Sequence, residues 1–443
     1  STVFLARFSF EGMSVMTHKK SHRLILVLLA LLLTSSVMVV SGQDTIELQL
    51  TWWGSQARHD RTIAVVEMYE AANPGIDIVY TFNSFGDYWT RLNTEAAGGN
   101  LACVMNQDYA YLGDWADRGL LMPLDEFIES GVIDTTNIDQ AYLDGGKIGD
   151  SVYGISLGIN TQSFILDAGA LEAAGLELPA VDWTWADFEQ LAMDYHAATG
   201  KWFIGNGLED VQLWKSLYLG YGMSPFEADG TALGYEDDQP LIDFYDMIVR
   251  LQDAGAVANR EEVVAMTGAG PEQGPVVTGQ AASAYQWSNQ LVAVFSAAGA
   301  DRNLVLHPLP RPVGGQSENY IKPSMYFSIT AGCPHPEEAA KFINFFTNSL
   351  EANDILLAER GVPISSAVRE HMLPNLDPVN AAAFAFVESV AEYASPIFPP
   401  DPPGFSAFLN NVWLPLFVDP VLYGQVTPAE AAPLMREEAN IVF

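Results

Sequence analysis

The sequence predicts an α/β fold whose first part is a parallel, doubly wound sheet. Apolar and polar residues alternate over residues 46–53 and again over residues 76–82, and this period of two is typical of strands. Each alternating segment is followed by a segment whose apolar residues have helical spacing, and strand–helix alternation favours a parallel sheet. With 443 residues, the chain is long enough for two domains with substantial cores.

The end of the first predicted strand is the first candidate site. Trp53 closes the strand and Gly54 stops it, and the polar side chains that follow are Gln56, Arg58 and His59. Ligands of open α/β sheets bind beyond the carboxyl ends of the strands, so we expect Trp53 at the rim of a site. An aromatic ring beside hydrogen-bonding groups suits a sugar. The alternative, left open by this stretch alone, is that both tryptophans are core residues and the loop is only solvated.

The next elements repeat this arrangement. A helical face near residues 63–69 ends at Asn73-Pro74-Gly75, and the strand over residues 76–82 follows it. A second helix is expected over residues 87–97, and a short third strand begins at Cys103. That strand also ends in polar and aromatic residues, Asp108 and Tyr109, which strengthens the interpretation as a site.

The remaining elements indicate a second sheet and a helical end. Thr184 to Asp187 form a capping-box pattern that opens a helix ending near residue 200. Strands are expected over residues 281–287, 304–309 and 325–330, and a helix begins at Pro336. The last hundred residues are predicted to be helices interrupted by a proline-rich loop at residues 396–403.

Residues 1–42 resemble a secretory signal peptide with an upstream extension. Lys19, Lys20 and Arg23 precede an unbroken apolar run at residues 24–33, and small residues stand at positions 41 and 42. An uncleaved anchor is the alternative, although ten strictly apolar residues are fewer than the roughly 20 that a spanning helix needs. We therefore expect secretion across the inner membrane, to the periplasm or the cell surface.

Charge and composition exclude several classes of function. The chain has 20 basic and 55 acidic residues, and residues 1–42 hold four of the basic and one of the acidic ones. The remaining segment carries 16 basic and 54 acidic residues, so nucleic-acid binding is not expected. Zinc-protease and Walker motifs are absent, and we expect no metal or cofactor. The two cysteines, Cys103 and Cys333, could pair, but the sequence does not show whether they are close.

The order of motifs resembles extracellular solute-binding protein family 1, the sugar-binding receptors of bacterial ABC importers, from about residue 47 to residue 373. The matching segments are LTWWGSQARHD, GLLMPLDEFI, VYGISLGINT, AGLELPAVDWTWADFEQL, TGQAASAYQWSNQL, KPSMYFSIT, HPEEAAKFINFF and ERGVPISSAVRE. One departure is Cys103, where the family leads us to expect an aspartate.

This resemblance implies a two-lobe periplasmic-binding-protein fold with hinge crossovers and a ligand cleft between the lobes. The expected first lobe is residues 43–156 and 312–350, and the expected second lobe is residues 157–311 and 351–443 with the C-terminal helices. The crossings are expected near residues 157–161 and 310–316. Family members close around their ligand, and the closed form is recognised by the membrane permease. The expected partners are a mono- or oligosaccharide and the permease subunits, and the protein is expected to be a monomer.

Thirteen residues are the predicted ligand-binding set. They join the residues at the strand ends to polar and aromatic residues near the crossings and in the motif ERGVP: Trp53, Gln56, Arg58, His59, Asp108, Tyr109, Asn160, Trp287, Ser288, Asn289, Lys322, Tyr326 and Arg360.

A secreted hydrolase acting on glycans or esters is the alternative function. Gly154 to Gly158 fit the G-x-S-x-G nucleophile elbow around Ser156, which requires a strand, a tight turn and then a helix. The residues after Gly158 look extended, which favours a crossover between lobes. A glycosidase needs two carboxylates about 5 to 10 Å apart, and the many acidic residues leave that alternative open.

Overall fold

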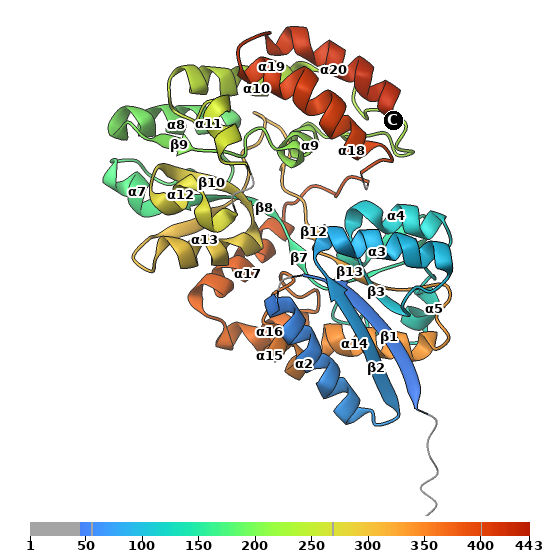
Figure 1. The fold of residues 1–443 in the computed structure, drawn as a ribbon. Helices are drawn as coiled ribbons and strands as arrows, with labels where there is room; N and C mark the ends of the chain where they lie inside the picture. Colours follow the sequence, from blue (N-terminus) through green and yellow to red (C-terminus); the bar gives the residue numbers. More distant parts are fainter. Residues whose placement is uncertain (1–44, 55, 268–269, 400) are drawn as a thin grey trace, which may run out of the picture. The chain divides into compact units, whose positions relative to one another are not determined.

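The computed structural model describes residues 45–54, 56–267, 270–399 and 401–443, and the expected signal peptide at residues 1–42 lies outside the described residues. Two sheets organise the chain from Ile46 onward (Figure 1). The first sheet has the strand order β2-β1-β3-β13-β6, and the second has the order β11-β8-β10-β9.

The first sheet contains the first three strands that the sequence predicted. These are β1 (Ile46–Trp53), β2 (Ile76–Asn83) and β3 (Val104–Gln107), which pair in parallel. The parallel arrangement predicted for these three strands is confirmed, and the sheet is completed by β13 (Tyr326–Ile329), which is antiparallel to β3 and to β6 (Ile155–Ser156). The chain enters β13 from the second lobe with no crossover helix, so it need not run parallel to its neighbour.

Both faces of the first sheet are covered by helices. Leu50 and Trp52 pack in one cluster with α2 (Gln56–Ala72) and α14 (Pro336–Asn348). Trp53 packs in another with α3 (Phe85–Gly98) and α4 (Tyr109–Asp117). Consecutive strand residues point to opposite faces, so the two tryptophans belong to two different cores. Helix α2 contains the helical face expected near residues 63–69 and begins earlier, at Gln56.

The second sheet is mixed and supports the second lobe. Strand β8 (Gln162–Asp167) is antiparallel to both β10 (Ala281–Trp287) and β11 (Leu304–His307), while β9 (Trp202–Ile204) is parallel to β10. Three helices pack their apolar residues in its main cluster: α8 (Trp185–Thr199), α9 (Val211–Gly220) and α10 (Gln239–Asp253). The predicted capping box of α8 is confirmed, since Thr184 and Asp187 bond each other's backbone N–H groups.

The C-terminal helices complete the core of the second lobe. They are α18 (Phe405–Phe408), the π-helix η4 (Leu409–Val418), α19 (Asp419–Leu422) and α20 (Pro428–Val442), and α19 and α20 pack on α10 (Figure 1). Among the described residues, the helical stretch Phe405–Leu422 is long and apolar enough to cross a membrane. Its residues Phe408, Trp413 and Phe417 are buried in the second lobe's cluster, which identifies it as a core element.

Two short strands carry the chain between the lobes. The outward crossing is β7 (Ile159–Asn160), and the return is β12 (Lys322–Pro323), which pairs with β7 in antiparallel fashion. The return was expected at residues 310–316, but these residues still contact the second lobe, since Gln316 N–H donates to the Gly220 carbonyl. The expected assignment of residues 351–372 to the second lobe also differs from the structure. Helices α15 (Leu350–Leu356) and α16 (Ser366–Met372) pack in the core of the first lobe.

The remaining helices and strands complete the two lobes and their connections. They are α5 (Asp125–Glu129), α6 (Gln140–Asp144), β4 (Lys147–Ile148), β5 (Ser151–Val152), α7 (Ala168–Ala173), α11 (Arg260–Ala265), η1 (Pro271–Gln273), α12 (Pro275–Thr278), η2 (Ser288–Gln290), α13 (Leu291–Ala298), η3 (Leu373–Asn375) and α17 (Pro378–Ala391).

A disulfide joins Cys103 and Cys333, whose Cα atoms are 4.5 Å apart. It links the residue before β3 to the loop after β13, two strands that are neighbours in the sheet but 230 residues apart in sequence. The bond also explains why a cysteine stands where the family resemblance led us to expect an aspartate.

Candidate functional site

Three adjacent cavities lie along the β7–β12 ribbon. Their volumes are about 240, 200 and 470 Å³, and we call them the Trp287 pocket, the arginine pocket and the Asp377 pocket. The first two share Trp287 and Lys322, and the last two share Asn160, Asn289 and Glu359. Ligand sites usually occupy about 300–1,000 Å³, so the three together offer room for a ligand larger than one sugar ring.

The Trp287 pocket combines an aromatic wall with charged groups. Trp287 ends β10, is half-buried, and lies with its ring 5.7 Å from the Lys322 ammonium. Tyr109 of the first lobe donates its hydroxyl to the Phe398 carbonyl at 2.6 Å, so the proline-rich loop bridges to that lobe. The described residues that line it are Asp108, Tyr109, Ala110, Gln212, Lys215, Trp287, Tyr320, Lys322, Ile397, Phe398 and Asp401.

A buried lysine forms part of the Trp287 pocket. Lys215 is 1% exposed, and its ammonium donates to Asp401 at 2.6 Å. The same ammonium lies 5.1 and 4.8 Å from the ring centres of Phe398 and Phe405. Burial lowers the pKa of Lys215, and the Asp401 carboxylate opposes that shift. The pair therefore fastens the proline-rich loop to α9.

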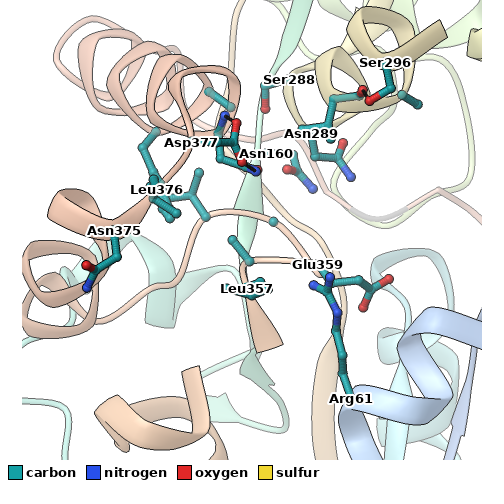
Figure 2. A pocket seen from close by; sticks show the side chains of 18 residues that line it. Arg61, Asn160, Ser288, Asn289, Ser296, Leu357, Glu359, Asn375, Leu376 and Asp377 are labelled. Atoms are coloured by element: carbon teal, nitrogen blue, oxygen red, sulfur yellow. Dashed lines mark hydrogen bonds between the residues drawn. The ribbon is translucent and has the colours of Figure 1, made fainter. Parts of the chain in front are cut away.

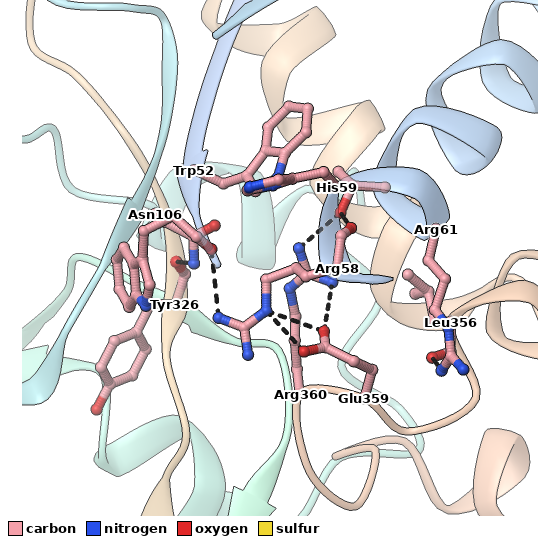
Figure 3. A network of polar contacts seen from close by, with 11 residues as sticks. Trp52, Arg58, His59, Arg61, Asn106, Tyr326, Leu356, Glu359 and Arg360 are labelled. Atoms are coloured by element: carbon pink, nitrogen blue, oxygen red, sulfur yellow. Dashed lines mark hydrogen bonds and ion pairs between the residues drawn. The ribbon is translucent and has the colours of Figure 1, made fainter. Parts of the chain in front are cut away.

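The arginine pocket is built around one carboxylate that two guanidinium groups share (Figure 3). Arg58 Nε lies 2.9 Å from both carboxylate oxygens of Glu359, and Arg360 Nη1 lies 3.4 Å from one of them. Burial would raise the pKa of Glu359, but the hydrogen bond and charge of Arg58 outweigh it and lower the pKa. Within the described part of the chain, its lining consists of Arg58, Asn160, Trp287, Asn289, Gln290, Lys322, Pro323, Ser324, Met325, Glu359 and Arg360.

The Asp377 pocket is the largest of the three and has a mixed lining (Figure 2). Amide and hydroxyl groups of Asn160, Ser288 and Asn289 line one part of it, and Arg61 and Glu359 line another. Helices α13 and α17 contribute apolar residues such as Val292 and Phe384. This cavity has polar groups of both kinds, donors and acceptors, beside apolar surface.

Nine of the thirteen predicted residues line these cavities. They come from both lobes and both crossing strands: Arg58, Asp108, Tyr109, Asn160, Trp287, Ser288, Asn289, Lys322 and Arg360. Whether they contact a ligand stays a prediction.

Trp53 and Tyr326 are instead core residues. The Trp53 ring is 5.2 Å from that of Tyr88 and 5.8 Å from that of Trp89, between the sheet and α3. Tyr326 is fully buried and donates its hydroxyl to the Gly145 carbonyl. The expectation that Trp53 stands at an open rim was wrong, because helices cover this face up to the end of β1.

Gln56 and His59 have local partners and lie outside the three cavities. Gln56 is exposed and bonds Asp60 one helical turn later at 2.7 Å. The His59 imidazole is buried, accepts a hydrogen bond from Trp52 Nε1 at 3.0 Å, and stacks on Phe82 with ring centres 4.0 Å apart. Burial, reinforced by the charge of Arg58, lowers the pKa of His59. This histidine therefore packs as a neutral ring.

The motif around Ser156 does not form a nucleophile elbow. Ser156 ends the two-residue strand β6, is 2% exposed, and donates its hydroxyl to the Gly158 carbonyl at 2.7 Å. The extended strand β7 follows, and the next helix begins only at Ala168. Among the described residues, no histidine forms a hydrogen bond with the Ser156 hydroxyl. The glycines serve close packing instead, since a Cβ at Gly158 would lie 2.7 Å from the Arg360 carbonyl oxygen.

Several lining residues were not found from the sequence. The clearest are Lys215, Tyr320, Phe398 and Asp401 in the Trp287 pocket, and Glu359 in the arginine pocket. Lys215 and Asp401 are 186 residues apart, so only the fold brings them together. The proline-rich loop was a usable signal, because a long loop beside an aromatic residue often belongs to a site.

A family model for bacterial extracellular solute-binding proteins matches residues 64–381. The chain belongs to this family. A structure of an extracellular solute-binding protein family 1 member from Alicyclobacillus acidocaldarius is 30% identical, with a TM-score of 0.75, over 90% of this chain and 98% of that one.

Two proteins of lower sequence identity extend the comparison. A periplasmic oligogalacturonide binding protein from Yersinia enterocolitica, in complex with saturated digalacturonic acid, is 21% identical with a TM-score of 0.74, over 89% of this chain and 98% of that chain. An uncharacterized lipoprotein from Streptomyces antibioticus is 24% identical over 319 residues, which are 69% of this chain and 67% of that protein. As a solute-binding protein, the chain has the two-lobe α/β architecture that the family resemblance implied.

Proposed function

We propose that this solute-binding protein captures a mono- or oligosaccharide in its interlobe cavities and delivers it to the permease of an ABC importer. The observation that carries the proposal is Trp287, a half-buried aromatic ring that lines two adjoining cavities between segments of both lobes. The apolar face of a sugar ring stacks on such a surface, while its hydroxyls pair with the surrounding amide and charged groups. The binding of an oligosaccharide by the distant Yersinia relative supports the same ligand class.

The ribbon of β7 and β12 is the proposed hinge. Each crossing strand is two residues long, so few backbone angles need to change for one lobe to rotate against the other. A ligand that contacts both lobes binds the closed form more tightly and shifts the population toward it. The closed form then docks on the permease.

The proposed location is outside the cytoplasmic membrane, in the periplasm or on the cell surface. The Cys103–Cys333 disulfide supports an oxidising compartment. The lipoprotein relative and the signal-like residues 19–42 are in keeping with export.

Replacing Trp287 with alanine is expected to weaken sugar binding by about 1 kcal/mol or more, roughly fivefold or more in Kd, because the stacking surface is lost. Titration calorimetry with a panel of mono- and oligosaccharides measures the change. Trp202→Ala is the matched control, since Trp202 is also a half-buried strand tryptophan of the second lobe but lines none of the three cavities. Equal affinities of the wild type and Trp287→Ala would contradict the site.

The same titrations test the hydrolase alternative when the sugars are analysed afterwards. We expect every sugar to be recovered intact, because the buried Ser156 hydroxyl is committed to Gly158. Turnover that disappears in Ser156→Ala would overturn the assignment as a receptor. Sugar binding that Trp287→Ala weakens, with every sugar recovered intact, would support the receptor.

A further inference from the structure

The arginine pocket departs from the charge balance of the rest of the chain. Residues 43–443 contain more than three acidic residues for each basic one. The lining of this pocket reverses that ratio, with Arg58, Lys322 and Arg360 against the single carboxylate of Glu359. Because the basic residues outnumber the acidic ones in this pocket, its electrostatic potential favours the binding of an anion.

Lys322 has no carboxylate partner among the described residues. Thirteen of the sixteen basic side chains after residue 42 form ion pairs, and Lys322 is one of the three that do not. Within the described part of the chain, its ammonium donates to the neighbouring Pro323 carbonyl at 3.3 Å and faces the Trp287 ring. It therefore has hydrogen-bonding capacity left on the side of the cavity where a sugar would stack.

Two of the three buried polar atoms without a partner in the described lining of this pocket can donate a hydrogen bond. They are Arg360 Nε, which donates, Ser324 Oγ, which can donate or accept, and Asn160 Oδ1, which only accepts. Arg360 is 3% exposed, and its other nitrogens bond Thr62 and Glu359. Burial, together with the charge of Arg58, lowers the pKa of Arg360 to about 9. The pocket thus has three cationic side chains and one carboxylate, so the protein does not neutralise all of the positive charge there.

We infer that the ligand is an acidic saccharide, whose ring lies on Trp287 and whose carboxylate lies toward Lys322 and the arginine pocket. The inference rests on the proposed function and narrows its ligand to uronic-acid sugars. The neighbouring Trp287 pocket is lined by two lysines and two aspartates, so its charges balance. One lysine and one aspartate, Lys215 and Asp401, form an ion pair. This pocket therefore suits the uncharged hydroxyls of the same saccharide. The charge-assisted bonds form at the border between the two cavities.

The test compares matched acidic and neutral ligands by titration calorimetry. The probes are digalacturonate, its dimethyl ester, and glucuronate, mannuronate and guluronate disaccharides with their neutral counterparts. We expect at least one acid to bind ten times or more tighter than its neutral partner, with an affinity that falls as salt is raised. Glucose 6-phosphate tests whether a phosphate serves as the anion instead.

Variants of Lys322 test whether this side chain binds the carboxylate of the ligand. Lys322→Gln is expected to weaken acid binding at least tenfold and neutral binding less than threefold, while Lys322→Arg retains acid binding. Lys201→Gln is the control, because Lys201 is also without an ion pair among the described residues but bonds the Gly279 carbonyl at the surface, away from the three cavities. Thermal unfolding establishes that each variant is folded.

Each outcome decides the inference. Neutral sugars that bind as tightly as the acids would overturn it while leaving the proposed receptor function intact, and so would acid binding that Lys322→Gln does not change. Binding of the phosphate sugar alone would also overturn it. If no saccharide binds, the proposed function fails together with the inference.

Discussion

Asp401→Ala is expected to lower the free energy of unfolding by about 3–5 kcal/mol, the usual cost of removing one partner of a buried ion pair. The Lys215 ammonium is almost completely buried, and Asp401 is the carboxylate that it contacts at 2.6 Å. Without Asp401, the charge stays buried between the rings of Phe398 and Phe405. Urea denaturation measures the change.

Two further variants separate the ion pair from other losses. Lys215→Met combined with Asp401→Ala should recover much of the stability, because no unpaired charge then remains buried. Asp114→Ala removes the partner of Arg118 from an ion pair that is about half exposed, and it should change stability by less than about 1 kcal/mol. Equal effects of Asp401→Ala and Asp114→Ala would contradict the role given to burial.

The cost of Asp401→Ala should fall as the pH rises toward the ordinary lysine pKa of 10.5. Burial already lowers the pKa of Lys215 in the folded chain, and removing Asp401 lowers it further. Between the folded and the unfolded pKa, the unfolded chain binds more protons, so raising the pH favours the folded state. Denaturation at pH 7 and pH 9.5 should therefore show a smaller difference from the wild type at the higher pH.

The strands of the first sheet could be predicted because a period of two is a local property. The alternation over Ile46–Trp53 reproduces β1, and it also implies that Trp52 and Trp53 face opposite sides. The further step, that Trp53 faces a ligand, failed because the sheet is covered on both faces. A tryptophan at the end of a strand is accessible only where the neighbouring helices leave the strand end uncovered, and the sequence does not contain that information.

The cavity lining was harder to predict because it depends on distant contacts. Trp287 could be selected from its amide-rich surroundings, but nothing near Lys215 in sequence indicates that Asp401 neutralises it. The return crossing was expected too early for the same reason. The proline-rich residues 308–312 suggest a linker, yet Arg311 N–H bonds the Trp183 carbonyl and keeps this segment on the second lobe.

Removing the Cys103–Cys333 disulfide is the second change with a large expected effect on stability. We expect a loss of about 2–5 kcal/mol, since the bond closes a loop of 230 residues and restricts the unfolded chain. The loop-entropy estimate for this length is about 5 kcal/mol, and residual structure in the unfolded state brings measured values below it. Reduction of the wild-type protein and the Cys103→Ala/Cys333→Ala double variant should give similar losses in urea denaturation.

The two forms of this experiment separate the crosslink from the packing of its sulfur atoms. Reduction keeps both side chains, whereas the double variant also removes part of the buried side chain of Cys103. Neither cysteine lines the three cavities, so ligand affinity at temperatures below unfolding should be unchanged in both. An unchanged denaturation midpoint after complete reduction would show that β3 and β13 are held in register by their hydrogen bonds alone. A loss of affinity without a loss of stability would connect this edge of the first lobe to the ligand.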